Sequence, residues 1–295
     1  MKEHAKESMN GKICLVTGAT NGIGKATALA LAQMGATVVI VGRSPAKCAA
    51  VVSEIRQISG NTRVEALVGD LSLMAEVRRL ADQFKAKYHE LHVLVNNAGA
   101  SFPKRQLTSE ALEQTFALNH LSPFLLTQLL LDTLKASAPA RVVTVSSDAH
   151  KGAHLEFDNL QTETGNYGLT AYGRSKLANV VFSYELARRL AGTGVTANAL
   201  HPGLVRTGFA GNMSPVAAAI INFIIRFVAL SPEQGAQTSV YLASSPEVEG
   251  VTGKFWEKSK ATPSGPASYD EPTWARLWDA SDQMIAATAT TAPRL

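Results

Sequence analysis

Tyr172 and Lys176 are the residues of this chain best suited to proton transfer, because they stand four positions apart in a segment expected to be helical from about 170 to 190. Residues at positions i and i+4 project from the same face of a helix. A free tyrosine has a pKa of about 10, and a neighbouring ammonium lowers it by stabilising the phenolate. The pair therefore predicts acid/base chemistry. The alternative is a tyrosine and a lysine that merely line a helix.

Two adjacent hydroxyls, Ser146 and Ser147, follow an apolar run that is expected to be a strand from Val142 onwards. Alternation along a strand turns one of the two hydroxyls toward a site and the other away from it. A hydroxyl placed at a developing oxyanion contributes roughly a few kcal/mol of transition-state stabilisation. Either serine could supply this group, and the alternative is a structural role at the end of the strand.

The run from Thr17 to Gly24 places glycines directly after the first apolar strand and at the start of a helix. Glycines permit a tight turn and a close backbone approach, and unpaired amides at a helix N-terminus favour a negative group. The spacing Gly-x-x-x-Gly-x-Gly in this context predicts a dinucleotide pyrophosphate site, against the alternative of an ordinary tight turn. The residues expected at the pyrophosphate are Gly18, Thr20, Asn21, Gly22, Ile23 and Gly24.

The second strand is followed by Arg43, at the place where a site selective for NAD would offer a carboxylate to the adenosine ribose. A guanidinium can instead stack on adenine and pair with a 2′-phosphate. NADP(H) is therefore the expected cofactor, and the alternative is a solvated arginine at a strand end. Lys25 and Lys47 add positive charge nearby, but they are explained more simply as exposed helix charges.

Short β-branched runs alternate along the chain with longer amphipathic segments. Repeated strand, helix and strand predict a parallel sheet with helices on both faces, because parallel neighbours need a crossover connection. The expected fold class is α/β, a Rossmann-type doubly wound parallel sheet in a single domain with a small helical substrate lid. The expected strands are Ile13–Thr17, Thr37–Val41, Val64–Val68, His92–Val95, Val142–Ser146 and Val195–Leu200.

No internal repeat or low-complexity linker divides the chain, so we expect one catalytic domain over residues 11–284. Residues 1–10 are expected to be a polar extension without a signal peptide, and residues 285–295 a flexible tail. The substrate lid is expected at about 208–230, because residues 216–230 are apolar almost all round. That stretch is shorter than the about 20 apolar residues that cross a bilayer. A subunit contact or a contact with a membrane surface stays open for it.

The composition excludes several classes of protein. With 46% hydrophobic and 18% charged residues, the chain can bury a core and is not disordered. Its net charge of +4 is spread without a Lys/Arg block, so no nucleic-acid partner is expected. The two cysteines have neither metal nor disulfide spacing, which fits a reducing cytoplasm, the expected localisation. His150 and His154 lack acidic or cysteine partners at ligand spacing, so no metal is expected.

Four motifs together resemble the short-chain dehydrogenase/reductase family (SDR) over nearly the whole chain. They are Thr17–Gly24, Asn96-Asn97-Ala98-Gly99, Tyr172-x-x-x-Lys176 and His201-Pro202-Gly203, in that order. Within the family the chain is most similar to the retinol-dehydrogenase-like branch. The segments that carry this similarity are Gly69–Ser72, Leu118–Leu121, Val145–Ser147, Ser175–Asn179 and Arg276–Trp278. Many members of that branch carry an N-terminal membrane anchor, whereas none is expected here.

The resemblance implies further contacts with the cofactor. It places Asp70 and Leu71 beside the adenine and Thr207 near the nicotinamide carboxamide. It also implies that Lys176 holds the nicotinamide ribose, and that the charge of the oxidised nicotinamide lowers the pKa of Tyr172. The other residues implied to support the cofactor are Asn97, Ala98, Gly99, Pro202 and Gly203.

The resemblance also favours Ser147 over its neighbour and makes Asn119 the fourth catalytic position. The main-chain carbonyl of Asn119 is implied to hold a water that links Lys176 to solvent. Pro123 stands four residues further on and has no N–H, so the helical hydrogen bond to that carbonyl cannot form. The alternative is a helix kink packed in the core. The long separation between Ser147 and Tyr172 indicates an inserted loop.

The leading hypothesis is an NADP(H)-dependent oxidoreductase that transfers a hydride between nicotinamide and a carbonyl or alcohol, with Tyr172 giving or taking the proton. The apolar stretch 216–230 predicts a lipophilic substrate, which is retinoid-like, steroid-like or long-chain. Two alternatives stay open: an NADP(H)-binding sensor or scaffold without turnover, and an enzyme that reduces a C=C bond. A homo-oligomer and a peripheral membrane contact stay open as well.

Overall fold

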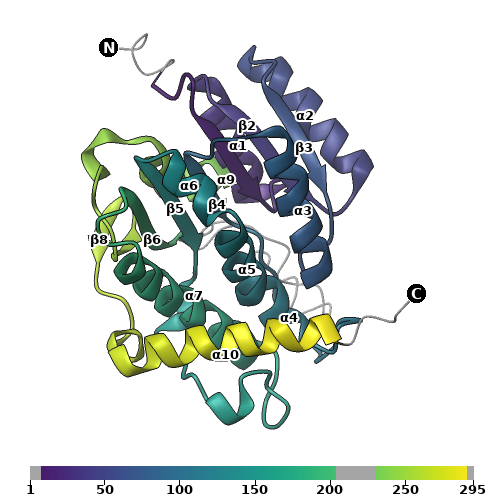
Figure 1. Cartoon of the computed structure of the whole chain (residues 1–295), viewed down its shortest axis with the longest axis vertical. Helices are drawn as coiled ribbons and strands as arrows, with labels where there is room; N and C mark the ends of the chain where they lie inside the picture. Colours follow the sequence, from purple (N-terminus) through teal and green to yellow (C-terminus); the bar gives the residue numbers. More distant parts are fainter. Residues whose placement is uncertain (1–7, 204–229, 291–295) are drawn as a thin grey trace.

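One sheet organises the molecule, in a computed structural model that describes residues 8–203 and 230–290 (Figure 1). Its strands lie in the order β3-β2-β1-β4-β5-β6-β7-β8, and all neighbours are parallel except β7 and β8. The bounds are β1 (Ile13–Thr17), β2 (Thr37–Gly42), β3 (Val64–Val68), β4 (Val93–Asn96), β5 (Ala140–Val145), β6 (Val195–His201), β7 (Phe255–Glu257) and β8 (Lys260–Thr262).

Helices cover both faces of the sheet, which explains why the central strands are apolar almost without interruption. One face carries α1 (Gly22–Gln33), α2 (Pro45–Ser59) and α9 (Pro232–Ser244). The other face carries α3 (Met74–Lys87), α5 (Ser122–Leu129), α7 (Leu169–Arg189) and α10 (Glu271–Thr290). Two shorter helices are α4 (Gln114–Phe116) and α6 (Leu131–Ala136). The expected doubly wound α/β class is therefore confirmed.

The direction of winding reverses between β1 and β4, which are adjacent in the sheet although β2 and β3 separate them in sequence. The chain first adds strands on one side of β1 and then returns to add β4 and β5 on the other. In open α/β sheets a crevice forms at the carboxyl ends of the strands at such a reversal, and ligands bind there. The fold thus places the candidate site before any side chain is considered.

The edge formed by β7 and β8 was not predicted from the sequence. Each strand has three residues, and the turn between them contains Lys258 and Ser259 at φ values of 50° and 56°. Glycine or asparagine is the usual residue in that left-handed region. Because the turn contains neither glycine nor asparagine and the strands are short, the sequence gives no indication of a hairpin here.

Both expected chain extensions turn out to belong partly to the folded domain. Met9 is buried, and its amide donates to the Met34 carbonyl at 3.0 Å, so the polar extension ends before residue 10. At the other end α10 continues through Thr290, past the expected boundary at 284. Ile285 is buried in the core, which explains why the helix does not end there.

The last helix, α10, lies across α7 on the outer side of the molecule (Figure 1). Trp278 anchors it, with its ring centroid 4.8 Å from that of Phe124 and 6.0 Å from that of Phe182. The guanidinium of Arg189 stacks 4.1 Å above the Trp278 ring. This packing holds α7, the helix that carries Tyr172 and Lys176, between the sheet and α10. Within residues 8–203 and 230–290, no helix has the length and apolar character to cross a membrane.

Candidate active site

Three of the predicted catalytic side chains come together where β5 ends beside the first turns of α7. The Tyr172 hydroxyl is hydrogen-bonded by the Ser147 side chain. The Lys176 ammonium lies 5.7 Å from the centroid of the Tyr172 ring. The tyrosine and the lysine stand four positions apart in the helix, and both project toward the end of β5, as the i, i+4 spacing predicts.

The two candidate serines have different partners. The hydroxyl of Ser146 is buried and donates to the Lys176 carbonyl at 2.7 Å, which ties β5 to α7. Ser147 is half-buried and contacts Tyr172, and its Oγ also accepts from the Ala149 amide at 3.3 Å. Only Ser147 therefore presents its hydroxyl to the phenol, which is the arrangement expected of an oxyanion-binding serine.

Lys176 is 3% exposed, and its Nζ donates to the Val145 carbonyl at 3.0 Å. The exposed Gly99 lies directly above it, since a Cβ added to this glycine would come within 3.1 Å of the Nζ. Any larger residue at position 99 would press on the amine. The absence of a side chain at Gly99 thus leaves space for the buried ammonium near the ends of β4 and β5.

Burial controls the ionisation of both catalytic groups. It lowers the pKa of Lys176 to about 8, because the charged amine loses its hydration. Burial also raises the pKa of Tyr172 above its usual value, and the hydrogen bond from Ser147 offsets this only in part. The lowering expected from the ammonium and from an oxidised nicotinamide stays a prediction. In this structure the ammonium donates to the Val145 carbonyl and lies over the Tyr172 ring.

The Asn119 side chain connects the loop after β4 to α7. Its Oδ1 accepts from the Ala100 amide at 2.9 Å, and its Nδ2 donates to the Ala100 carbonyl and to Ser175 Oγ, both at 2.9 Å. Ser175 precedes Lys176, so Asn119 fixes the loop that contains Gly99 relative to the lysine. The sequence singled out the Asn119 carbonyl and gave no sign of these side-chain bonds.

Asn119 lies in the π-helix η1 (Ala117–Leu121), between α4 and α5. The Ser122 amide donates to the Ala117 carbonyl, five residues back, in place of the usual four. Pro123 follows and cannot donate to the Asn119 carbonyl, which agrees with a departure from regular α-helical bonding at this point. Such single π-turns occur frequently at functional sites.

The glycine run forms a tight connection from β1 to α1. A Cβ on Gly18 would lie 2.7 Å from the Ala98 Cα, and one on Gly24 would lie 2.4 Å from Asn97 Nδ2, so neither position has room for a side chain. Asn21 is the N-cap residue of α1 and is exposed, and its side chain makes no capping bond. The first amides of α1 therefore remain available to an anion.

Asn97 holds the glycine turn against the end of β4. Its Nδ2 donates to the Thr17 carbonyl at 2.8 Å and to the Gly18 carbonyl at 3.2 Å. The amides of Asn97 and Ala98 both donate to Thr17 Oγ1 at 3.0 Å. These bonds join the two strands at the reversal of the sheet, where the predicted cofactor residues are brought together.

Arg43 and Asp70 lie beside each other beyond the ends of β2 and β3. Their closest charged atoms are 4.0 Å apart, and the Arg43 side chain is 68% exposed. The second oxygen of Asp70 is occupied, since it accepts from the amide and the hydroxyl of Ser72 at 2.9 and 2.8 Å. The guanidinium is therefore exposed beyond the ends of β2 and β3, with room to contact a phosphate.

This set of groups fits a dinucleotide. Uncapped amides at α1 suit the pyrophosphate, the Arg43 guanidinium suits a 2′-phosphate, and only the side-chain-free Gly99 lies against the Lys176 ammonium on that side. Pro202 and Gly203 follow β6 on the same side of the sheet, and a Cβ on Gly203 would meet Leu230 at 2.5 Å. Thr207 and residues 208–229, most of the expected lid, lie outside the described residues.

The inserted loop between β5 and α7 is fixed to the rest of the domain by polar contacts. His150 is buried, and its Nε2 accepts from the Gly265 amide at 2.8 Å while its Nδ1 donates to the Ser147 carbonyl at 2.6 Å. Both ring nitrogens are thus engaged within the protein. Tyr167 donates to the buried carboxylate of Glu113, which also caps α4. None of these contacts follows from a local sequence signal.

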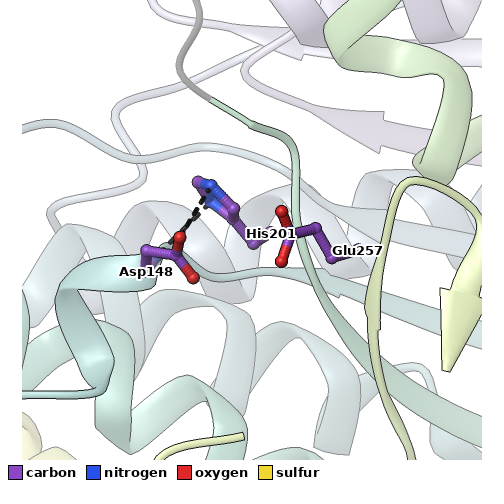
Figure 2. Close-up of side chains that lie close together, drawn as sticks. All are labelled: Asp148, His201 and Glu257. Carbon is purple, nitrogen blue, oxygen red and sulfur yellow. Dashed lines mark hydrogen bonds and ion pairs between the residues drawn. The ribbon is translucent and has the colours of Figure 1, made fainter. Parts of the chain in front are cut away.

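Figure 2 shows Asp148, His201 and Glu257 close to one another, and Asp148 directly follows Ser147 in the sequence. The His201 Nε2 lies 3.5 Å from an Asp148 oxygen, and its Nδ1 accepts from the Asp148 amide at 3.3 Å. A metal-bound histidine normally donates from its second ring nitrogen. Lys151 also lies 2.7 Å from Asp148. The cluster is therefore better described as a charge network that holds the turn after β5.

Comparison with known proteins agrees with this geometry. The family model for the short chain dehydrogenases matches residues 12–217. The human retinol dehydrogenase 13 is 40% identical over 95% of this chain and 86% of its own length. The human polyprenol dehydrogenase is 41% identical over 92% of this chain and 84% of its own length.

A solved structure supports the same assignment. The NADP active-site complex of RhlG from Pseudomonas aeruginosa has a TM-score of 0.70 and 30% identity, covering 90% of this chain and 99% of that one. The family is one of oxidoreductases that use NAD(P). The chain belongs to the short-chain dehydrogenase/reductase family, in its retinol-dehydrogenase-like branch.

Proposed function

We propose that this protein is an NADP(H)-dependent oxidoreductase that interconverts a lipophilic carbonyl compound and its alcohol. The observation that carries the proposal is the meeting of Ser147, Tyr172 and Lys176 where β5 ends beside α7, next to the exposed Gly99. A proton donor, an oxyanion-binding hydroxyl and an ammonium are the groups that this reaction requires of a protein.

The choice of NADP(H) is supported by Arg43. Its guanidinium is exposed at the adenosine end of the crevice, and the neighbouring Asp70 is held by Ser72, so the carboxylate is not free to turn toward a ribose. A charge-assisted pair between a guanidinium and a phosphate is among the stronger hydrogen-bonded contacts. NADP(H) would therefore be preferred over NAD(H).

The roles of the catalytic residues follow from their contacts. Bound NADPH would supply the hydride, which is transferred to the carbonyl carbon as the C=O π bond breaks. Tyr172 then gives its proton to the carbonyl oxygen, and Ser147 donates a hydrogen bond to that oxygen. Lys176 stabilises the phenolate left on Tyr172 and holds the ribose. Because burial raises the pKa of Tyr172, the phenol is protonated at neutral pH and ready for the reductive direction.

A lipophilic substrate is supported by the apolar stretch 216–230, of which residues 216–229 lie outside the described residues. The names of the relatives also point this way, since retinol and polyprenol are both long apolar alcohols. Burying each methylene contributes about 0.8 kcal/mol. In an aldehyde series from butanal to decanal, KM should fall several-fold per added carbon, and an unchanging KM would contradict an apolar pocket.

The proposal is tested by a substrate panel with both cofactors. Retinal, steroid ketones, long-chain aldehydes and aromatic aldehydes are each incubated with NADPH and with NADH, and the consumption of cofactor is followed with product analysis. We expect alcohols as products and a preference for NADPH. Tight NADPH binding without turnover on any of these compounds would favour the sensor or scaffold, and a saturated carbonyl product would favour the C=C reductase.

A further inference from the structure

The peptide group between Ser147 and Asp148, just after β5, is held at both of its polar atoms by histidine side chains. Its carbonyl accepts from His150 Nδ1 at 2.6 Å, and its N–H donates to His201 Nδ1 at 3.3 Å. The main-chain amide of His150 donates to the same carbonyl at 3.1 Å. The orientation of this peptide group is therefore set from two sides, by a residue three positions later and by a residue at the end of β6.

The hydrogen-bond partners of His150 determine which of its ring nitrogens carries the proton. The Gly265 amide lies 2.8 Å from Nε2, and because a backbone amide can only donate, this nitrogen accepts. The proton is therefore on Nδ1, which donates it to the Ser147 carbonyl. The ring is fully buried, and its centroid lies 4.7 Å from that of Phe255 in β7. His150 thus joins the catalytic serine to the loop after β8.

The same reasoning gives His201 the opposite arrangement. Its Nδ1 accepts from the Asp148 amide, so the proton of the neutral ring lies on Nε2. This Nε2 is 3.5 Å from a carboxylate oxygen of Asp148, and a dashed line marks the contact in Figure 2. Glu257 lies beside His201 on the neighbouring strand β7. Pro202 and Gly203 follow directly, so His201 also joins the serine to the segment expected to support the cofactor.

Both rings are neutral at neutral pH, because burial lowers the pKa of each below the ordinary value of 6.5. Four charged side chains face the rings, and they form two pairs of opposite charge. Lys151 lies 2.7 Å from Asp148, and Lys258 lies 3.8 Å from Glu257. Neither carboxylate therefore depends on a protonated histidine for a partner. Protonation of His201 would place an N–H on Nδ1, which could then no longer accept from the peptide group.

We propose that His150 and His201 are positioning residues for Ser147: together they fix the peptide group that follows the serine, and so hold its hydroxyl at the Tyr172 phenol. β5 ends at Val145, so Ser147 lies beyond the strand and its main chain needs other contacts to hold it. A displacement of about 1 Å at a reacting site can cost about 10²-fold in rate. The proposal rests on the role given to Ser147 in the proposed function.

The first test is spectroscopic and does not depend on turnover. Ring ¹⁵N chemical shifts of the histidine-labelled protein report which nitrogen carries the proton. His150→Asn and His201→Asn identify the two sets of signals among the seven histidines. At neutral pH we expect the proton on Nδ1 in His150 and on Nε2 in His201. A wild-type protein with the proton on Nε2 of His150, or on Nδ1 of His201, overturns the proposal, whether or not the variants are active.

The second test compares two substitutions of His150 that are similar in size. Asparagine can donate from near the place of Nδ1, whereas leucine cannot. We expect His150→Asn to keep kcat within about threefold and His150→Leu to lose about tenfold or more, because small misplacements at a reacting site are costly. The KM for NADPH should stay unchanged in both variants, since Ser147 serves the substrate oxygen. Equal kcat values for the two variants would overturn the positioning role of His150.

The third test is the pH dependence of kcat. In the wild type kcat should fall as the pH decreases below 6.5 through the lowered pKa of His201, because the protonated ring cannot accept from the Asp148 amide. His201→Asn keeps an acceptor near the place of Nδ1 and does not titrate, so the fall should move to lower pH. An acid limb that is the same in this variant and in the wild type would overturn the role of His201.

His92→Leu is the matched control. His92 is also buried, and its Nδ1 also accepts from a backbone amide, that of Ile13 at 3.1 Å. This contact lies at the amino ends of β1 and β4, whereas Ser147 follows the carboxyl end of β5. We expect the control to lose stability and to keep kcat and its pH dependence. A loss of kcat as large as that of His150→Leu would overturn the specific role of His150.

Failure of the proposed function is distinguishable from failure of this inference. A wild type that turns over no carbonyl would count against the proposed function, while the ¹⁵N result would still decide how the two histidines hold the peptide group.

Discussion

The phosphate-binding end and the proton-transfer end of the candidate site use different kinds of chemical groups. At the phosphate end the protein offers backbone amides, glycines without room for a side chain, and one exposed guanidinium. At the proton-transfer end it uses ionisable side chains, the half-buried Tyr172 and the buried Lys176, whose pKa values both move in the direction that disfavours charge.

This difference separates binding from chemistry. Backbone amides bind an anion without any cost of desolvating a buried charge, so the phosphate end can be rigid and stable at once. A buried lysine with a single carbonyl partner weakens the fold while it serves the reaction. Changes at the two ends should therefore differ in kind: loss of affinity at one, and loss of turnover with altered stability at the other.

The largest effect is expected for Tyr172→Phe. Only the hydroxyl that carries the proton is removed, so kcat should fall by about 10²–10⁴-fold, as is typical of a lost general acid. The Kd for NADPH, measured by fluorescence titration, should change less than threefold. A variant that retains more than about a tenth of the wild-type kcat would mean that another group donates the proton.

Lys176→Met is expected to lower activity and raise stability together. Burial lowers the folded-state pKa of Lys176 to about 8, so between about pH 8 and the ordinary value of 10.5 the unfolded chain binds more protons than the folded one. The contribution of Lys176 to the free energy of unfolding therefore rises as the pH rises from about 8 to about 10.5. Below about pH 8 the lysine is charged in both states, and the folded state is destabilised by the full free energy of burying that charge.

Methionine removes this cost. The variant should be about 1–3 kcal/mol more stable than the wild type at pH 7, and the gain should vanish above about pH 10.5. Urea unfolding of the variant and the wild type at a series of pH values measures both the gain at pH 7 and its loss at high pH. A variant less stable than the wild type at pH 7 would show that the ammonium stabilises the fold, and the contrast between the two ends would then be lost.

Arg43→Ala should affect cofactor choice with little effect on chemistry. Losing one charge-assisted pair costs about 1.5–3 kcal/mol, which corresponds to about 10-fold to 150-fold in kcat/KM for NADPH. The value of kcat/KM for NADH should hardly change, because that cofactor has no 2′-phosphate. The two cofactors are compared with one saturating substrate, and an equal loss with both would indicate that Arg43 stacks on adenine without selecting the phosphate.

The smallest effect is expected for Lys25→Ala, at the phosphate end. Lys25 is bonded to Glu54 at 2.6 Å, and both side chains are partly exposed. Such pairs contribute about 0–1 kcal/mol. The free energy of unfolding should change by less than about 1 kcal/mol, and the Kd for NADPH less than threefold. A tenfold weaker Kd would show that Lys25 leaves Glu54 to contact the cofactor.

The sheet and the glycine turn could be predicted because their signals are local. β1 and β3 coincide with their predicted bounds, and the other predicted strands differ only at their ends. Apolar runs, helix spacing and glycines each report on a few neighbouring residues. The fold class follows from the order of such local elements, without any knowledge of long-range contacts.

The parts that escaped prediction depend on contacts between distant segments. His120 meets Ser281 across 161 positions, and the interaction between Tyr167 and Glu113 spans 54. Met9 and Ile285 belong to the core only because other elements cover them. The hydrogen bond from the Lys176 ammonium to the Val145 carbonyl spans 31 positions and has no local sequence signal either.

In the proposed reaction a hydride passes from NADPH to the carbon of a C=O group. This transfer is followed by incubating the protein with retinal, which contains both C=O and C=C bonds, and with NADPH deuterated at both C4 positions. We expect retinol that carries one deuterium, bonded to the carbon that bears the hydroxyl. Deuterium in a saturated carbon of a product that keeps its aldehyde would contradict carbonyl reduction, and so would the absence of deuterated product from retinal and decanal alike.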